Sequence, residues 1–140
     1  MALFFKYKKI DMPEPLEPVY APAIPVTLSG IKESLDVIAL LDSGADMTAI
    51  PIGIAEIIGA DLSGKKEEVV GVGGKVSAVE SKIICIVKGG HEKYNFSLTV
   101  KVLLGDLEGK FPILLGRKDF FENFDITFKE SDKKMVLKKV

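Results

Sequence analysis

The sequence predicts a single, mainly β domain with one or two short helices. Its 140 residues fit one domain with a real hydrophobic core, and 47% of them are hydrophobic. Short apolar runs separated by glycine, proline or charged residues recur along most of the chain, as in β proteins. Between Tyr94 and Leu104, apolar residues occupy every second position, which is the period of a half-buried strand.

The chain begins with a proline-rich segment, and residues 1–23 are expected to form an N-terminal arm ahead of a domain at 24–140. Residues 3–10 mix apolar side chains with lysines and indicate a strand or an ordered arm. The prolines that follow exclude a helix or a central strand and favour extended chain. The arm is either a connector on the surface or a segment that reaches a partner subunit.

The first half of the domain is expected to contain a hairpin and a helix. The apolar runs 24–29 and 35–41 flank a turn-like stretch, which indicates the hairpin. Residues 52–59 follow Pro51, a residue that suits the first helical position, and their isoleucines share one helical face. Gly53 and the β-branched side chains predict that this helix is short.

Strand patterns return in the second half. Residues 76–87 and 94–104 are apolar runs on either side of a glycine turn. Residues 111–116 indicate a short buried strand that ends at a glycine. Residues 117–124 are expected to form a short amphipathic helix with its phenylalanines inward, and residues 126–137 a closing hairpin around a charged turn.

The composition excludes several classes of partner. Lysine and arginine total 19 and aspartate and glutamate 20, so no charge excess points to nucleic acid or to a membrane surface. No apolar run approaches the ~20 residues of a membrane span, and the first apolar run is too short for a signal peptide. A cytoplasmic protein is expected. Cys85 lies in an apolar run and is expected to be a buried, inert thiol.

The sequence Asp42-Ser43-Gly44 places a carboxylate directly after an apolar run, 37–41. The strand that carries it is expected to be buried on both faces. A carboxylate there costs free energy unless hydrogen bonds or a shared proton compensate, which suits a catalytic acid. Gly44 permits a sharp turn. The same tripeptide alone is also ordinary turn sequence, so the interpretation depends on the strand before it.

Arg117 is the only arginine in a chain whose other cations are lysines. This favours a bidentate role that lysine cannot fill, with Asp46 as the natural partner. The alternative is a solvated arginine at the start of a helix. The glycine cluster Gly71-Val72-Gly73-Gly74 indicates a close backbone approach to a ligand, a mobile hairpin tip or a plain turn. No spacing typical of a metal site is present, so no metal or cofactor is expected.

Three motifs in this order resemble the retropepsin-like aspartic peptidases: Leu41–Thr48, the glycine cluster at 71–74, and Ile113–Arg117. The resemblance covers residues 24–128 and is to the single-domain branch, which includes retroviral proteases and their cellular and prokaryotic relatives. It implies a closed, β-barrel-like acid protease fold with the active site at a two-fold axis. The proline-rich start departs from the short viral N-terminal strand.

The resemblance also implies roles for individual residues. Asp42 matches the catalytic aspartate, Ser43 the hydroxyl residue that bonds to the other subunit's loop, and Gly44 the glycine beside the substrate. Further residues would support the active-site loop or form the flap over the substrate. The loop set is Ala45, Asp46, Thr48 and Arg117, with Asp46 and Arg117 as an ion pair, and the flap set is Gly71, Val72, Gly73 and Gly74.

These observations lead to the hypothesis of an aspartic endopeptidase that acts on an extended peptide or protein substrate. One chain supplies one acid, so a homodimer is expected, with an Asp42 dyad that shares one proton. Pepsin-like enzymes carry a hydroxyl residue where this chain has Ala45, so activity is expected to peak at mildly acidic pH. The alternatives are a non-catalytic peptide-binding homodimer of the same fold and an unrelated small β protein in which Asp42 is a turn residue.

Overall fold

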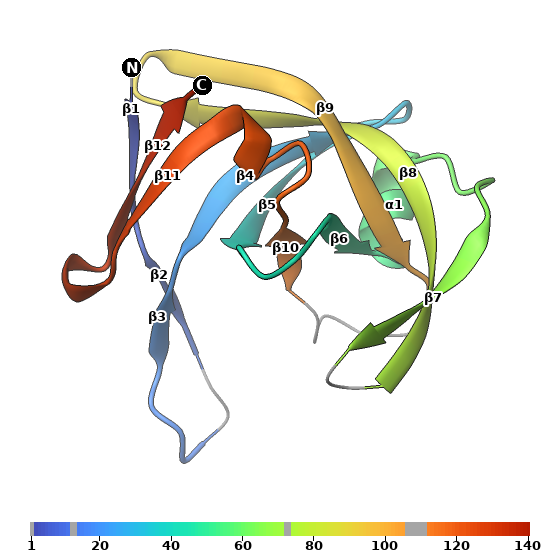
Figure 1. The fold of residues 1–140 in the computed structure, drawn as a ribbon, viewed down its shortest axis with the longest axis horizontal. Coiled ribbons are helices and arrows are strands. Elements are labelled where there is room, and N and C mark those ends of the chain that lie inside the picture. The colour runs from blue at the N-terminus through green and yellow to red at the C-terminus, as the bar shows by residue number, and fades with distance from the viewer. Residues whose placement is uncertain (1, 12–13, 72–73, 106–111) are drawn as a thin grey trace.

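The computed structural model is mainly β, and the strands in the part of the chain that it describes form three sheets (Figure 1). It describes residues 2–11, 14–71, 74–105 and 112–140. In that part of the chain the helices are short: α1 (Ile52–Ile58) and the 3-10 helices η1 (Phe121–Asn123) and η2 (Glu130–Asp132). The expected fold class, mainly β with short helices, is confirmed.

The largest sheet closes on itself. Its strand order is β4-β5-β10-β6-β9-β8-β7, and an additional pairing between β4 and β8 joins six of these strands into a ring with β7 outside it. The strands are β4 (Ala23–Ser29), β5 (Ser34–Leu41), β6 (Thr48–Pro51), β7 (Lys66–Gly71), β8 (Gly74–Gly89), β9 (Glu92–Leu103) and β10 (Ile113–Leu115).

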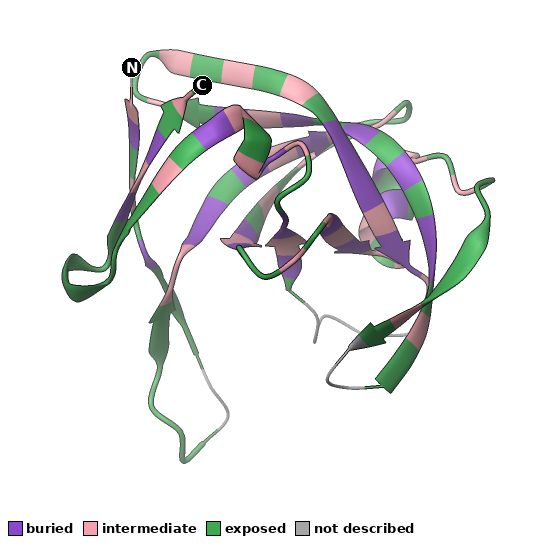
Figure 2. Ribbon diagram, viewed as in Figure 1, coloured by how far each residue is buried: buried purple, intermediate pink, exposed green. Residues whose placement is uncertain are grey.

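The core fills this ring. Buried and exposed residues alternate along β8, as Figure 2 shows, because successive side chains of a strand point to opposite faces. Along β9, Leu98, Val100 and Val102 are fully buried. At one end of the core, the rings of Phe120 and Phe124 pack together with their centroids 5.4 Å apart. The core is therefore continuous from the ring of strands to the C-terminal part of the chain.

A second sheet joins the two ends of the chain. Its order is β1-β12-β11, with β1 (Ala2–Lys6), β12 (Lys134–Lys139) and β11 (Phe124–Lys129). Leu3 and Tyr7 are buried in the same core as the ring. The first residues of the expected arm thus pack onto the domain. The third sheet is a hairpin of β2 (Lys8–Ile10) and β3 (Val19–Ala21).

Helix α1 matches the expected helix. Pro51 stands at its start, and Gly59 ends it with a left-handed φ of 77°, a conformation that glycine adopts without strain. The prediction of a helix at 117–124 is wrong in length. Only the 3-10 helix η1 forms there, and β11 begins at Phe124. Asp119, with a φ of 66°, interrupts the helical path. Phe120 and Phe124 are buried as expected.

The expectation that the strand before Asp42 is buried on both faces is also wrong. Ala39 and Leu41 of β5 are buried, but Ile38 is 51% exposed and Leu40 is half-buried. The reason is that only one face of β5 packs on the core of the ring. The apolar run reflects a strand whose outer face carries apolar side chains without being covered by this chain.

Candidate active site

Asp42 follows the last residue of β5 and is held by the strand beside it. β5 and β10 pair in parallel, with Leu41 opposite Leu115, and the Asp42 amide donates a 3.0 Å hydrogen bond to the Leu115 carbonyl. Asp42 is half-buried. A regular strand pairing therefore continues to the backbone of the acidic residue, which fixes where its side chain starts.

The turn after Asp42 orients its carboxylate. Oδ1 of Asp42 accepts a 2.9 Å hydrogen bond from the Gly44 amide, and the Asp42 carbonyl accepts one of 3.1 Å from the Ala45 amide. A Cβ atom on Gly44 would lie 3.2 Å from the same Oδ1, which is a tight approach. Ser43 is exposed. The tripeptide presents one aligned carboxylate with a hydroxyl beside it.

The segment after β10 fixes the rest of this loop. The Gly116 amide donates to the buried Thr48 hydroxyl at 3.0 Å, the Arg117 amide to the Ala45 carbonyl at 2.9 Å, and the Lys118 amide to the Asp46 carbonyl at 2.9 Å. Together with the Asp42 to Leu115 bond, these contacts join the two segments at four points. The joined residues are Asp42, Ala45, Asp46 and Thr48 in the first segment and Leu115, Gly116, Arg117 and Lys118 in the second.

The side chains of Asp46 and Arg117 form an ion pair. Both are exposed, the Asp46 side chain by 87% and that of Arg117 by 58%. Exposed pairs contribute little to stability because water screens them, typically below about 1 kcal/mol. The backbone hydrogen bonds around the pair therefore stabilise the loop more than the pair itself does.

Gly116 is a residue that the sequence reasoning missed as part of this site. A Cβ atom there would lie 2.4 Å from the carbonyl carbon and 2.5 Å from the carbonyl oxygen of Met47. The two segments can approach this closely only with glycine at 116. The signal was present in the sequence as the glycine between the buried strand and the lone arginine, where it was interpreted as the end of the strand and as part of the motif Ile113–Arg117 but given no role in the site.

Gly71 and Gly74, the two outer residues of the glycine cluster, lie at the end of β7 and at the start of β8. Gly71 pairs with Gly74, and Gly74 has a φ of 111° that favours glycine. Val72 and Gly73 lie outside the described residues. In Figure 1 this hairpin extends from the body of the domain and stands apart from the loop that follows β5. The structure brings together the residues of the Asp42 loop and Arg117, and it places Gly71 and Gly74 on a separate element.

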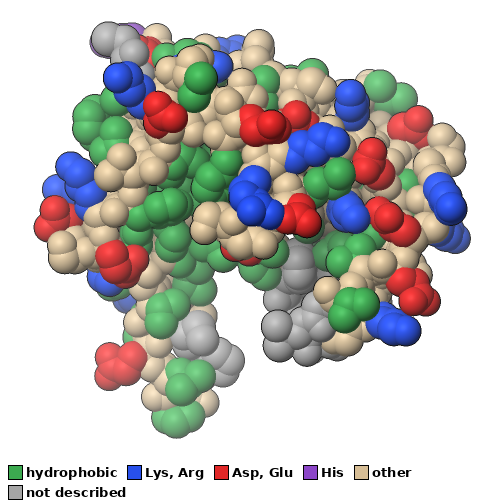
Figure 3. Space-filling view, in the orientation of Figure 1, with side chains coloured by type: hydrophobic (Ala, Val, Ile, Leu, Met, Phe, Trp, Pro, Cys, Tyr) green, Lys and Arg blue, Asp and Glu red, His purple; other side chains and the backbone are tan. Residues whose placement is uncertain are grey.

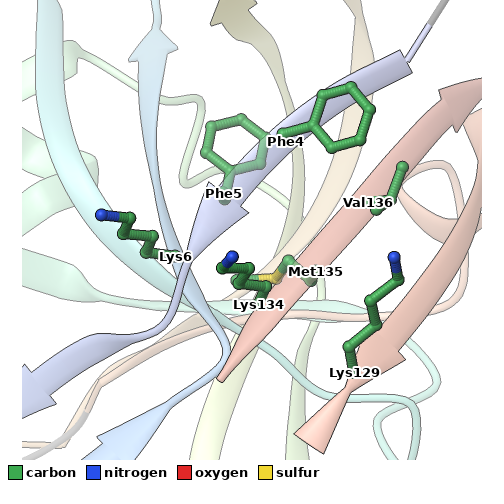
Figure 4. A pocket seen from close by; sticks show the side chains of 7 residues that line it. All are labelled: Phe4, Phe5, Lys6, Lys129, Lys134, Met135 and Val136. Carbon is green, nitrogen blue, oxygen red and sulfur yellow. The ribbon is translucent and has the colours of Figure 1, made fainter. Parts of the chain in front are cut away.

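The hollow in Figure 4, of about 300 Å³, lies elsewhere. Its lining comes from β1, β12 and the end of β11, with none of the Asp42 loop residues. Among the described residues, no group of histidine, cysteine or carboxylate side chains could hold a metal ion. In the same part of the chain, no helix has the length and apolar character that a membrane span requires.

No family model and no curated protein matches the sequence. Solved structures do match the fold. The EIAV protease complexed with the inhibitor HBY-793 superposes with a TM-score of 0.51 and 21% identity, over 73% of this chain and 86% of that one. A retropepsin-like aspartic protease from Rickettsia conorii gives a TM-score of 0.61 and 15% identity, over 98% and 90%. The chain has the fold of the retropepsin-like aspartic proteases.

Proposed function

From this fold, we propose that the protein is an aspartic endopeptidase and that its active form is a homodimer with Asp42 of each subunit at the centre. The observation that carries the proposal is the Asp42-Ser43-Gly44 turn at the open end of β5, where the Gly44 amide orients the carboxylate. Each chain contains this tripeptide once. A second acid must therefore come from a second copy.

Two such carboxylates a few ångströms apart share one proton, because both cannot be ionised at that separation. The ionised Asp42 takes a proton from a water molecule, which then attacks the scissile carbonyl carbon. The protonated Asp42 donates a hydrogen bond to the carbonyl oxygen and stabilises the charge that develops there. The proton taken from water then passes to the leaving amine, and the peptide bond breaks.

The hydrogen bonds around the loop give this chemistry its geometry. Contacts from Leu115, Gly116 and Arg117 fix the chain at Asp42 and in the loop after it, so that the carboxylate needs little reorganisation during the reaction. The exposed Ser43 hydroxyl is proposed to bond to the loop of the other subunit. Ala45 offers no hydroxyl to the ionised dyad, which favours activity at mildly acidic pH.

We propose an extended peptide as the substrate. A peptide in this conformation adds backbone hydrogen bonds to strand-like edges, and side-chain pockets then select the sequence. The hairpin of β7 and β8, with the glycine cluster at its end, is proposed to close over the bound peptide. The cytoplasmic location stays a prediction from the sequence.

The test is hydrolysis of an unfolded protein substrate between pH 3 and pH 7 by the wild type and by Asp42→Asn. We expect the wild type to cleave with a maximum at mildly acidic pH and Asp42→Asn to be inactive. Asp132→Asn, the same change at an exposed position in η2, is the matched control and should retain full activity. Equal traces for the wild type and Asp42→Asn would overturn the proposal.

A further inference from the structure

The hairpin of β2 and β3 forms a sheet of its own. Ile10 pairs with Val19 and Lys9 with Tyr20, and among the described residues neither strand pairs with the two larger sheets. A two-stranded hairpin alone is only marginally stable in water, because it has no second layer to cover its apolar side chains. Its stability therefore depends on a surface that covers it.

Both faces of this hairpin carry exposed apolar side chains. Ile10 and Val19 are directly opposite each other and share one face, where they are 39% and 46% exposed. Tyr20 belongs to the other face and is 53% exposed. Figure 3 shows hydrophobic side chains on the limb that the hairpin forms below the body of the domain. Apolar patches of this kind mark interaction surfaces, and tyrosine is a frequent interface residue.

The hairpin is firmly attached at both of its ends. Tyr7, just before β2, is buried, its amide donates to the Lys133 carbonyl at 2.8 Å, and its hydroxyl donates to Glu130 at 3.1 Å. Pro22, just after β3, accepts a 2.9 Å hydrogen bond from the Leu41 amide. Both ends of the hairpin are therefore fixed to the domain.

The C-terminal end of the hairpin lies close to Asp42, because Pro22 is bonded to Leu41, the residue before Asp42. Ala23 pairs with Leu40 and Pro22 bonds to Leu41, so the chain before β4 runs past the end of β5 at which Asp42 stands. The three residues of β3 at about 3.3 Å each carry the hairpin roughly 10 Å beyond that point. A second copy whose Asp42 lies within a few ångströms of the first must occupy this neighbourhood.

We propose that the β2–β3 hairpin is a clasp inserted into the second copy of the chain, beside that copy's Asp42 loop, so that the second copy covers Ile10 and Val19 on one face and Tyr20 on the other. The proposal rests on the dimeric site of the proposed function. It assigns the exposed apolar side chains of the hairpin to the interface that the single Asp42 motif requires, and it makes the hairpin a determinant of dimer affinity. If the hairpin packs against its own subunit, or against no surface at all, the proposal is wrong.

The first experiment measures dimer dissociation by sedimentation. The double variant Val19→Ser/Tyr20→Ser removes apolar contacts from both copies, so we expect its dissociation constant to rise at least about tenfold. The control is Ile31→Ser, since Ile31 is 94% exposed in the turn between β4 and β5, at their other end from Asp42. It should dissociate like the wild type.

Activity measured against enzyme concentration separates the clasp from the chemistry. The double variant should lose activity on dilution and regain it at high concentration, because its Asp42 loops are intact. If the variant dimerises and cleaves as the wild type does while Asp42→Asn is inactive, the clasp is wrong and the peptidase proposal stands. If the wild type stays monomeric and the Asp42→Asn variant cleaves as well as the wild type does, both the clasp and the peptidase proposal are wrong.

Crosslinking tests the contact without weakening it. Tyr20→p-benzoylphenylalanine is prepared in copies with natural nitrogen and copies with ¹⁵N, which are mixed before illumination. We expect crosslinked peptides that join differently labelled copies, with the second peptide from the surface near Asp42. Crosslinks confined to one copy would overturn the clasp. The same photoreactive residue at Ile31 should give no crosslinks between copies.

Discussion

The buried hydroxyl of Thr48 accepts a 3.0 Å hydrogen bond from the amide of Gly116, a residue 68 positions further along the chain. Thr48 begins β6, and Gly116 follows directly on β10. The bond closes the loop that starts at Asp42, because Asp42 itself is bonded to the residue before Gly116. The position of the proposed catalytic carboxylate is therefore set by two segments that meet only in the folded chain.

Replacement of Thr48 by valine keeps the shape of the side chain and removes the acceptor. The Gly116 amide is then buried without a partner, which costs about 1–3 kcal/mol of the free energy of unfolding. Chemical denaturation followed by circular dichroism measures the difference. Thr48→Ser is the control, since it keeps the hydroxyl and should cost less than valine. Equal stability of Thr48→Val and the wild type would show that this bond does not fix the loop.

Replacement of Gly116 by alanine forces the two segments apart. The added Cβ atom would lie 2.4 Å from a backbone carbon of Met47, which cannot move aside as a side chain can. We expect a less stable protein with strongly reduced hydrolysis, because the loop at Asp42 shifts. The matched control is Gly53→Ala in α1, where an added Cβ atom would meet nothing within 4 Å outside its own stretch of helix, and alanine should add about 0.5–1 kcal/mol of stability. Unchanged hydrolysis by Gly116→Ala would contradict the proposed packing.

Asp119 makes stability depend on pH. Its partial burial raises its pKa, but the hydrogen bonds with Thr99, at 2.7 Å from the backbone amide, and the charges of Lys118 and Lys82 outweigh that effect and hold the pKa below the usual 3.8. A carboxyl whose pKa is lowered in the folded state stabilises the fold above its ordinary pKa and loses this contribution as the pH falls.

Asp119→Asn should therefore be less stable than the wild type at pH 7, with a constant difference down to about pH 5. Below pH 4 the difference should shrink as the wild-type carboxyl takes up its proton. Denaturation curves of both proteins across this pH range measure the difference in their free energy of unfolding. A difference that is independent of pH would mean that the charge of Asp119 plays no part.

Cys85 tests the integrity of the core. It is fully buried between the strands, and burial raises the pKa of its thiol to about 12. We expect almost no reaction with a thiol reagent at pH 8 in the native protein and rapid reaction after denaturation, because only the thiolate reacts. Fast modification of the native protein would mean that this part of β8 opens readily.

The sequence predicted the elements that local signals define. Helix α1 was found because Pro51 and the spacing of its isoleucines are local signals, and β9 because its alternation runs through eleven residues from Tyr94 to Leu104. The helix after Arg117 was too long in the prediction, since nothing in the sequence shows that Asp119 turns away and bonds to Thr99 of β9.

The candidate site was predicted in its residues but not in its packing. Asp42 and the pair of Asp46 and Arg117 follow from the kinds of residue and their order. The hydrogen bond between Thr48 and Gly116 joins positions far apart in the chain, and a single sequence does not show which distant positions come into contact. The apolar run before Asp42 was misinterpreted because a strand covered by its own chain and one with an open apolar face look alike in sequence.

The most direct test of the central claim mixes wild-type chains with Asp42→Asn chains. The proposed dyad requires one Asp42 from each of two copies, so a mixed dimer has one acid and is inactive. After exchange of subunits at a fixed total concentration, hydrolysis should fall with the square of the wild-type fraction. A linear fall would mean that each wild-type chain cleaves on its own, and it would contradict the shared dyad.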